Sequence, residues 1–345
     1  IVRELGDVAA LVGVYDVNPL RAATVAAKAG GVSRFESFEE MLRSSRPDPV
    51  IVCTKDGAHH EYIVKALEAG CDVITEKPMT IDAPRCRQIL EAERRTGRTV
   101  SVIFNMRSYP FTERIKEVVA RGEVGTVLGV DFEWILDTRH GADYFRRWHA
   151  RLANSGGLLV HKATHHFDIV NWWIDEDPVT VYATGSRRYY GDDRRPHGER
   201  CSRCAEAASC ELYLDLRADP TMVELYLDAE PADGYWRDRC VFDRGIDIMD
   251  TMSVSVRYSR GALLTYSLVA HSPWEGWRIA ISGTAGRLEA EQFSSGPHAG
   301  AGHDEIRVYD RRGSLVTHRV ARAAGSHGGA DERLRRHLFR GDLPD

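Results

Sequence analysis

The chain has 345 residues and a mass of 38.7 kDa, which is too large for one ordinary hydrophobic core and predicts two domains or one large α/β domain. With 43% hydrophobic and 28% charged residues, the composition excludes a disordered or low-complexity chain. The formal net charge is −5 and like charges form no long blocks, so we expect neither a nucleic-acid partner nor a membrane-surface partner. No apolar run approaches the roughly 18 residues of a membrane span, and we expect a cytoplasmic protein.

Residues 1–106 alternate between short apolar runs and amphipathic segments. This alternation is typical of right-handed βαβ units and predicts a doubly wound α/β domain with a parallel sheet. The expected strands are 11–17, 49–54, 72–75 and 99–104, and the expected helices are 20–29, 36–43, 58–69 and 83–96.

Residues 107–345 have longer β-rich runs separated by turn residues, which predicts an α/β domain with a large, mostly antiparallel open sheet. A bridging helix is expected over 111–121, and a second helix follows Gly156-Gly157. Residues 143–149 are expected to form a loop at the rim of a pocket. The expected strands are 127–136, 179–186, 254–258, 263–270, 278–283, 287–291, 305–309 and 315–320.

Asp16 closes the first apolar run and is a candidate for the acid that binds the adenosine ribose in a dinucleotide-binding sheet. The alternative is that Asp16 and Asn18-Pro19 form only a turn and a helix cap. A carboxylate here favours NAD because it would repel the 2′-phosphate of NADP, although Arg21 keeps NADP open.

The Gly-rich loop that normally precedes such an acid is absent from the sequence. We therefore expect a fragment that lacks the first strand, its Gly-rich loop and about twenty or more N-terminal residues. The alternative is a chain that cannot bind a pyrophosphate in the usual way.

The tripeptide Glu76-Lys77-Pro78 follows an expected parallel strand, at the edge where open α/β sheets bind ligands. Lysine is rare here, with six among 46 basic residues. A lysine at a strand end can bind a substrate hydroxyl and lower its pKa, which makes Lys77 a candidate catalytic residue. The alternative is a solvated surface lysine.

Several motifs, in order and at matching spacing over residues 11–290, resemble the glucose-fructose oxidoreductase/inositol dehydrogenase (Gfo/Idh/MocA) family. They are VYDVNP at 14–19, ALEAGCDVITEKP at 66–78, Asn105-Met106-Arg107, Gly156-Gly157 followed by His165 and Asp168, and GTAGRL at 283–288. The resemblance implies an NAD(P)-dependent oxidoreductase acting on a sugar, polyol or sugar derivative. It also implies a Rossmann domain over 1–106, a substrate-binding domain over 107–345, and a homodimer or homotetramer.

The resemblance assigns roles to Lys77, His165, Asp16, Glu76 and Pro78, and the other candidates below follow from their places in the sequence. Lys77 and His165 are the expected proton-transfer residues. The expected cofactor-binding residues are Asp16, Arg21, Thr54, His59, Glu76, Lys77, Pro78 and Asn105. The expected substrate-binding residues are Lys162, His166, Arg107, Trp148 and His149, with the alternative that His166 and Asp168 are structural.

His161 departs from the family pattern, in which many dehydrogenases carry Asp four residues before the histidine. On one continuous helix His161 and His165 would share a face. His161 is then a third catalytic candidate that binds substrate and shuttles a proton. The competing interpretation is that the two histidines chelate a metal, which the neighbouring Lys77 and Lys162 disfavour.

A cysteine cluster within an insertion at about 190–242 is an addition to the family pattern. It consists of Cys201, Cys204, Cys210 and Cys240. Four thiolates, two of them in a C-x2-C knuckle, suit a structural Zn²⁺. Reduced thiols, disulfides and an iron–sulfur cluster are the alternatives.

The leading functional hypothesis is oxidation of a sugar hydroxyl with hydride transfer to NAD. A second hypothesis is NAD-dependent glycoside hydrolysis through transient oxidation, elimination and return of the hydride. A third is a non-catalytic sugar- or nucleotide-binding regulator that kept the fold.

Overall fold

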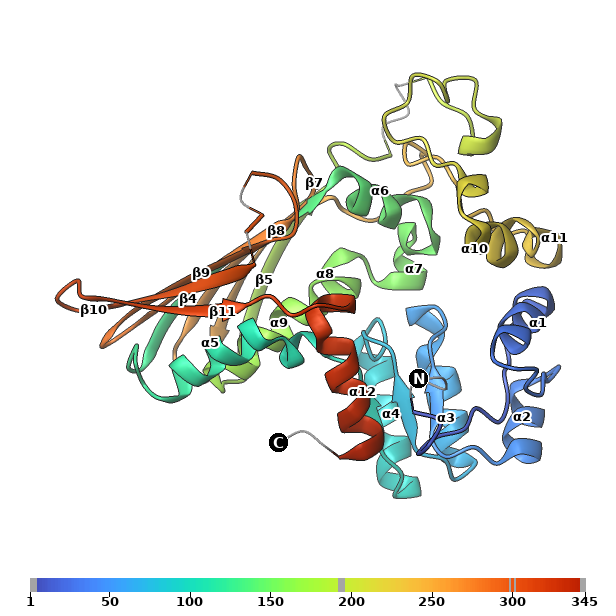
Figure 1. The fold of residues 1–345 in the computed structure, drawn as a ribbon, viewed down its shortest axis with the longest axis horizontal. Helices are drawn as coiled ribbons and strands as arrows, with labels where there is room; N and C mark the ends of the chain where they lie inside the picture. The colour runs from blue at the N-terminus through green and yellow to red at the C-terminus, as the bar shows by residue number, and fades with distance from the viewer. Residues whose placement is uncertain (1–4, 192–195, 298, 301, 342–345) are drawn as a thin grey trace.

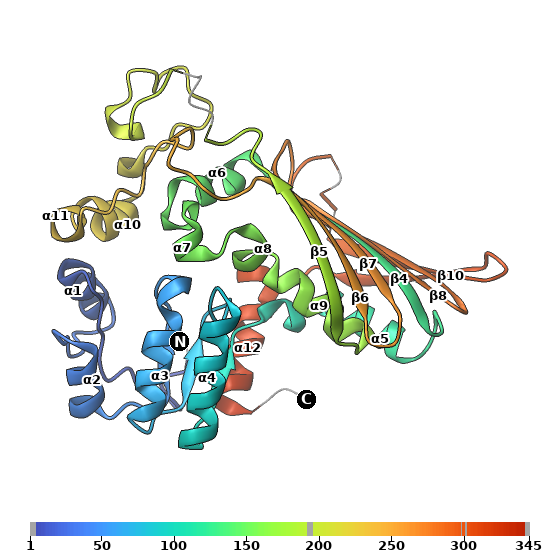
Figure 2. The same cartoon turned by 180° about the vertical axis from the view of Figure 1, so that it is seen from behind.

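The structure, a computed structural model, describes residues 5–191, 196–297, 299–300 and 302–341. The N-terminal helices and a small sheet form one end of the molecule, and a large sheet extends away from them (Figures 1 and 2). Three helices, α5 (Pro110–Ala120), α9 (Thr164–Ile174) and α12 (Ala330–Arg340), lie between the small sheet and the large one. None of the helices in the described ranges has the length and apolar character needed to cross a membrane.

The small sheet is parallel with the strand order β1-β2-β3, as a doubly wound domain requires. Its strands and helices are α1 (Pro19–Lys28), α2 (Phe38–Ser45), β1 (Val50–Val52), α3 (His59–Glu68), β2 (Val73–Thr75), α4 (Ala83–Thr96) and β3 (Val100–Val102). Ile63, Leu67 and Ile89 from the helices pack with Val73 in one buried cluster. The expected parallel α/β arrangement is therefore confirmed.

The expected strand at 11–17 is wrong. Residue Val14 makes a single isolated bridge to Arg34, and the described part of the segment has no other ladder pairing. Its backbone bonds run to Ser33 and Phe35. One bridge cannot sustain a strand, because a strand is stabilised by the repeated pairs of a ladder.

Local caps set where the N-terminal helices begin and end. Asn18 accepts hydrogen bonds from the backbone N–H groups of Leu20 and Arg21, and Pro19 occupies the first turn of α1. Asp82 caps α4 in the same way, and Gly97 ends that helix with a φ of 70°, which suits glycine.

The large sheet has the order β11-β10-β9-β8-β4-β7-β6-β5. Among the described ladders of this large sheet, only the β4–β7 pair is parallel. The expected mostly antiparallel sheet is therefore confirmed. The strands are β4 (Val127–Asp137), β5 (Pro178–Ser186), β6 (Thr251–Tyr258), β7 (Leu263–Ser272), β8 (Gly276–Gly283), β9 (Gly286–Phe293), β10 (His303–Asp310) and β11 (Leu315–Ala321).

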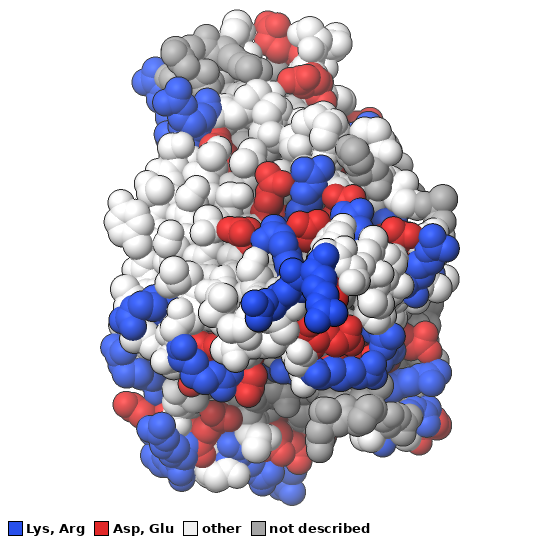
Figure 3. All heavy atoms as spheres, turned by 90° about the vertical axis from the view of Figure 1, so that its left-hand side faces the viewer, with Lys and Arg blue, Asp and Glu red and all other residues white. Residues whose placement is uncertain are grey.

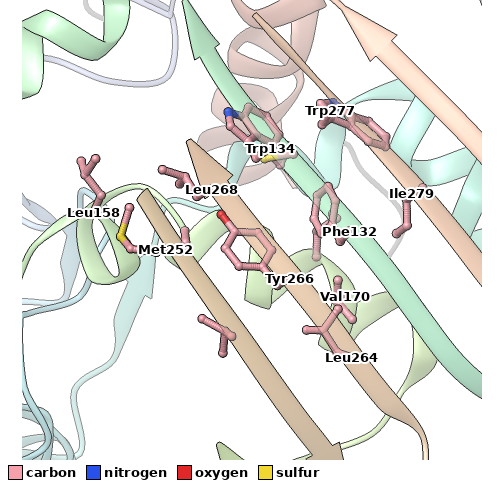
Figure 4. Packing of buried hydrophobic residues seen from close by; sticks show 14 of the residues in the cluster. Phe132, Trp134, Leu158, Val170, Met252, Leu264, Tyr266, Leu268, Trp277 and Ile279 are labelled. Carbon is pink, nitrogen blue, oxygen red and sulfur yellow. The ribbon is translucent and has the colours of Figure 1, made fainter. Parts of the chain in front are cut away.

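One face of the large sheet forms the main core. Alternate residues of β6 are buried, as a sheet with one covered face demands. Phe132, Trp134, Tyr266 and Trp277 meet on this face under α5 (Pro110–Ala120) and α9 (Thr164–Ile174), as Figure 4 shows. Each large buried side chain contributes about 1.5–3 kcal/mol, so this cluster is a main source of stability for the C-terminal half.

The opposite face of the large sheet is polar. Arg278 lies 3.4 Å from Glu291, and Arg287 lies 2.9 Å from Glu289. Seen from the free end of the sheet, basic and acidic side chains intermix beside an uncharged area (Figure 3). The edge strand β5 exposes Val181 and Tyr182 to 61% and 72%.

The helices between β4 and β5 correct two expectations. Residues 143–149 do not form a loop, because α6 (Thr138–Arg146) runs through most of them. The helix expected after Gly156-Gly157 is two helices, α8 (Leu158–His161) and α9, which are separated at Lys162 and Ala163. The remaining helices are α7 (Leu152–Ser155), α10 (Pro220–Met222), α11 (Glu230–Asp233) and α12 (Ala330–Arg340).

Candidate functional site

Lys77 lies at the carboxyl end of β2, as predicted, and points toward the C-terminal half of the chain. Its Nζ donates a hydrogen bond of 2.7 Å to the carbonyl oxygen of His161. Burial lowers the pKa of Lys77, and the charge of Lys162 lowers it further. The amine is therefore closer to neutrality than an exposed lysine, which suits it to proton transfer.

Asp56 is a site residue that the sequence prediction missed. It follows β1, the strand next to β2, and its Oδ2 lies 2.5 Å from Nδ1 of His161. Asp56 is 2% exposed and His161 9%. An acid placed just after a buried parallel strand, at the edge that carries Lys77, was the signal that could have identified it.

Asp56 thus binds the ring of His161, and Lys77 binds its backbone carbonyl oxygen. Both residues follow strands of the N-terminal sheet. Burial raises the pKa of the Asp56 carboxyl and lowers the pKa of the His161 imidazole, with the Lys77 charge adding to the second shift. Both shifts favour the uncharged forms, so the pair shares a proton across a short contact. With Nδ1 engaged, Nε2 is the ring nitrogen left to exchange a proton with substrate.

His165 does not lie one helical turn after His161, because the helix is interrupted between them. No three His, Cys, Asp or Glu side chains in the described ranges are grouped so that they could hold a metal ion, and the chelation hypothesis gains no support. Nδ1 of His165 is buried without a hydrogen-bond partner in the described structure. Burial lowers the pKa of His165 well below its usual value, with Lys77 and Lys162 adding to the shift.

Trp148 and His149 lie beside His161, and their role in substrate binding stays a prediction. Their rings stack at 3.6 Å, and the His149 ring lies 4.2 Å from that of His161. Tyr144 contacts both imidazoles edge-on. We call Asp56, Lys77, His149, His161 and His165 the catalytic cluster.

Two expected substrate-binding residues have other surroundings. His166 is fully buried, stacks on Trp134 at 3.9 Å and bonds to the Tyr266 hydroxyl at 2.7 Å. It is a core residue, as the structural alternative proposed. The Lys162 ammonium lies 4.9 Å from the centre of the Trp134 ring, where a cation–π contact holds it beside the catalytic cluster.

Arg107 and Asn105 make contacts outside the cluster. Arg107 forms two hydrogen bonds with Asp168, at 2.8 and 2.6 Å, and so joins the segment after β3 to α9. Asn105 donates to Asp331 of α12. Both side chains are bound by acids outside the catalytic cluster, and the role of Arg107 in substrate binding stays a prediction.

Three of the residues expected to bind the cofactor, Thr54, Lys77 and Asn105, come just after β1, β2 and β3, at the carboxyl edge of the small sheet. The donor set fits a dinucleotide, because the Asp16 carboxylate can accept hydrogen bonds from ribose hydroxyls, and Glu76 and Pro78 flank Lys77 at the strand end. His59 is fully buried, with its ring nitrogens facing the carbonyl oxygens of Pro78 and Thr54. The ring joins the ends of two strands. Because both ring nitrogens face protein carbonyl oxygens, the direct contact with a cofactor that the sequence predicted is not open to His59 in this structure.

Arg21 is engaged by acids on two sides. It lies 3.4 Å from Asp16 and 2.9 Å from Asp233 of α11. Asn18 donates to the carbonyl oxygen of Ala229, so α10 and α11 pack against α1 (Figures 1 and 2). The insertion therefore reaches the ribose end of the expected cofactor site.

The four clustered cysteines all line one cavity of about 340 Å³. Backbone N–H groups donate to two of the sulfurs, from Gly198 to Cys204 and from Phe242 to Cys240. Burial raises the pKa of the Cys240 thiol, and the neighbouring cysteines raise it further. The thiols are unpaired by disulfides, and they are not drawn together into a metal-binding geometry in the described structure.

Comparison with known proteins identifies both halves. The NAD-binding Rossmann-fold model of the Gfo/Idh/MocA oxidoreductase family matches residues 2–104, and the family's C-terminal α/β-domain model matches residues 116–341. The Bacillus subtilis protein YteT is 39% identical over 97% of this chain and 83% of its own length. Inositol 2-dehydrogenase of Pseudomonas savastanoi pv. phaseolicola is 27% identical over 80% of this chain and 84% of its own.

A solved levoglucosan dehydrogenase, in complex with NADH and levoglucosan, has the same fold. It superposes with a TM-score of 0.68 at 16% identity, over 95% of this chain and 80% of that one.

Proposed function

Because the chain belongs to the Gfo/Idh/MocA oxidoreductase family, we propose that it transfers a hydride between a CH–OH group of a sugar, polyol or sugar derivative and NAD. The observation that carries the proposal is the 2.7 Å contact between Lys77 Nζ and the His161 carbonyl. It brings the strand-end lysine of the NAD-binding half into the imidazole group of the other half. Bound NAD would supply the hydride acceptor.

The chain's own residues handle the hydroxyl proton. Lys77 binds the reacting hydroxyl and lowers its pKa. Once the shared proton has left the Asp56–His161 pair, Nδ1 of His161 donates to the Asp56 carboxylate, and Nε2 accepts the hydroxyl proton. His165, with its unpaired Nδ1, is a second acceptor for a substrate hydroxyl. Trp148 and His149 form the wall beside them.

NAD is the proposed cofactor in preference to NADP. Arg21 is the one basic residue that the sequence offered for a 2′-phosphate, and it is engaged by Asp16 and Asp233. Two carboxylates beside the ribose would repel the phosphate. A sugar-like substrate is supported by relatives named as inositol and levoglucosan dehydrogenases.

NAD-dependent glycoside hydrolysis is the second candidate. It needs one group for the hydroxyl proton and another for the proton next to the transient carbonyl. Lys77 and the Asp56–His161 pair provide two such groups. This excess of acid–base residues is the observation that favours it.

One assay separates these candidates. The purified chain is given NAD⁺ with free sugars, polyols and chromogenic glycosides, while nicotinamide absorbance and aglycone release are followed together. Accumulating NADH supports the dehydrogenase, and NAD⁺-dependent aglycone release without NADH supports the hydrolase. If neither signal appears but NADH and sugars bind, a non-catalytic binding protein replaces both.

We also propose that the four-cysteine cluster takes up a structural zinc ion, which would close the insertion around the cavity they share. Because the thiols are not preassembled, they would have to move together on binding. Metal analysis of the purified chain tests this, with Cys204→Ser as the variant and Cys53→Ser as the control outside the cluster. Zinc below one equivalent in the unmodified chain would contradict it.

A homodimer or homotetramer remains our proposal for the assembly, supported by the exposed apolar residues of edge strand β5. Light scattering on the purified chain would determine the oligomeric state.

A further inference from the structure

Two arginines from distant parts of the chain meet beside the catalytic cluster. Arg147 follows α6, and Arg237 lies after α11 in the cysteine-rich insertion. Both bind Asp143, whose Oδ2 lies 3.3 Å from Arg147 Nη1 and whose Oδ1 lies 2.7 Å from Arg237 Nη2. Two guanidinium groups therefore share a single carboxylate.

Three of the remaining guanidinium nitrogens of this pair are buried without hydrogen-bond partners among the residues that the structure describes. Arg237 is 6% exposed, and its Nε and Nη1 have no hydrogen-bond acceptor among the residues that the structure describes. Nε of Arg147 and Nδ1 of His149 are also buried without a hydrogen-bond partner among the described residues. A buried donor left unpaired costs about 1–3 kcal/mol, so several at one place call for an acceptor that binds there.

The charges that act on His149 are positive. Burial lowers the pKa of His149 to about 2, and Arg147, Lys77 and Arg237 all add to the shift. The Arg147 charge also acts on Asp56, Lys77 and His161, so the arginine pair adjoins the catalytic cluster. Asp143 offsets only one of the two guanidinium charges.

We propose that Arg147 and Arg237 form a subsite for an anionic substituent of the substrate, such as the carboxylate of a hexuronic acid. The free Nε–H of Arg147 and the free Nε–H and Nη1–H of Arg237 could each donate one charge-assisted hydrogen bond to an oxygen of a carboxylate. The reacting hydroxyl would then lie against Lys77 and His161, on the other side of His149. This inference rests on the proposed function and narrows its substrate class from sugars to acidic sugars.

The insertion gains a role from this assignment. Arg200 is buried and binds both Asp238, at 2.7 Å, and Glu230 of α11, at 2.6 Å. These ion pairs fix the backbone on either side of Arg237. The insertion therefore supplies half of the subsite in addition to its contacts with α1.

Calorimetric titration of the full chain, with NAD⁺ present, tests the subsite directly. The probes are D-glucuronate and D-galacturonate, each compared with its neutral sugar, and inorganic sulfate and phosphate alone. The unmodified chain should bind a uronate at least about tenfold more tightly than the matching neutral sugar. Arg237→Gln should remove most of that preference.

Two further variants separate binding from damage to the fold. Arg239→Gln removes an exposed arginine two residues away, which stacks on Trp236, and should leave the preference unchanged. Asp143→Asn removes the carboxylate that competes with the ligand and should tighten uronate binding by several-fold. A purely structural role for these residues would not produce a gain.

Several results would overturn the subsite: equal binding of uronates and neutral sugars, an unchanged preference in Arg237→Gln, or tight binding of inorganic anions with no competition from uronates. Failure of the proposed function looks different. Uronate binding that depends on Arg237, with no NADH formation and no aglycone release, would leave the subsite in place and refute the enzyme assignment.

Discussion

Replacing Asp56 with asparagine is the most direct test of the catalytic cluster. The amide has the shape of the carboxylate but no charge, and its NH₂ group can donate to Nδ1 of His161 where the carboxylate oxygen now lies at 2.5 Å. That exchange would place the imidazole proton on Nε2, so the ring could no longer accept a proton from substrate. We therefore expect Asp56→Asn to lower kcat strongly while NADH still binds.

The size of the loss follows from the contact. Once the shared proton has left the pair, Asp56 is a carboxylate, and a hydrogen bond to such a charged, buried group contributes about 1.5–3 kcal/mol, which corresponds to roughly 10-fold to 160-fold in rate. The wrong tautomer adds to this, and an Asp-to-Asn change in the serine protease triad costs about 10⁴-fold. We expect a decrease in kcat of at least about a hundredfold.

The assay is kcat against pH, with binding of NADH followed by fluorescence. In the unmodified chain the rate should rise with pH as the shared proton leaves the Asp56–His161 pair, under the influence of Lys77, Lys162, Glu76, Arg147, His149 and the nearby Tyr144. Asp56→Asn should lose this rise. Asp56→Gly should recover activity with added formate, which a purely structural role would not allow.

Stability provides a second measurement on the same variant. Because burial raises the pKa of Asp56, the folded chain binds a proton that the unfolded chain releases, and stability is lost as pH rises from the usual carboxyl pKa toward the raised one. Asp56→Asn should therefore gain thermal stability relative to the unmodified chain as pH increases. Glu61→Gln, an exposed change in α3, is the matched control. Unchanged kcat, pH profile and stability difference in Asp56→Asn would refute the reasoning.

Three other predictions concern single residues. Lys77→Met should reduce kcat by about 10²–10⁴-fold, and a kcat within a few-fold of the unmodified chain would contradict its role. Because burial lowers the pKa of Lys77 to about 8, its titration should shape the alkaline limb of the pH–kcat profile of the unmodified chain. Tyr266→Phe removes the partner of His166 and should cost about 1–3 kcal/mol in chemical unfolding, with kcat nearly unchanged. Arg107→Ala breaks a pair in which the arginine is 44% exposed, so the free energy of unfolding should change by less than about 1 kcal/mol, and a large rise in KM would restore Arg107 to the substrate site.

Most of the fold could be predicted because it depends on local patterns. Alternating strands and helices indicated the parallel sheet, and caps such as Asn18 and Asp82 set helix ends that agree with the structure within a few residues. The failures have tertiary causes. The run at 11–17 has strand-like residues, but the described structure pairs it through one bridge only.

The site was partly predictable for the same reason. Lys77 could be singled out because its strand, its turn and its rarity are visible in the sequence. The helix break after His161 could not be predicted, because neither glycine nor proline marks it in the sequence, and the interruption at Lys162 and Ala163 is visible only in the structure.

The sequence by itself determined the two-part α/β organisation, the strand-end lysine and the presence of an unusual histidine. Only the tertiary structure decided what those residues contact. Asp56 and His161 are 105 residues apart, and Arg147 and Arg237 come from different segments that meet at Asp143. Periodicity and spacing report interactions between near neighbours in the chain, whereas these contacts depend on how the two halves and the insertion pack together.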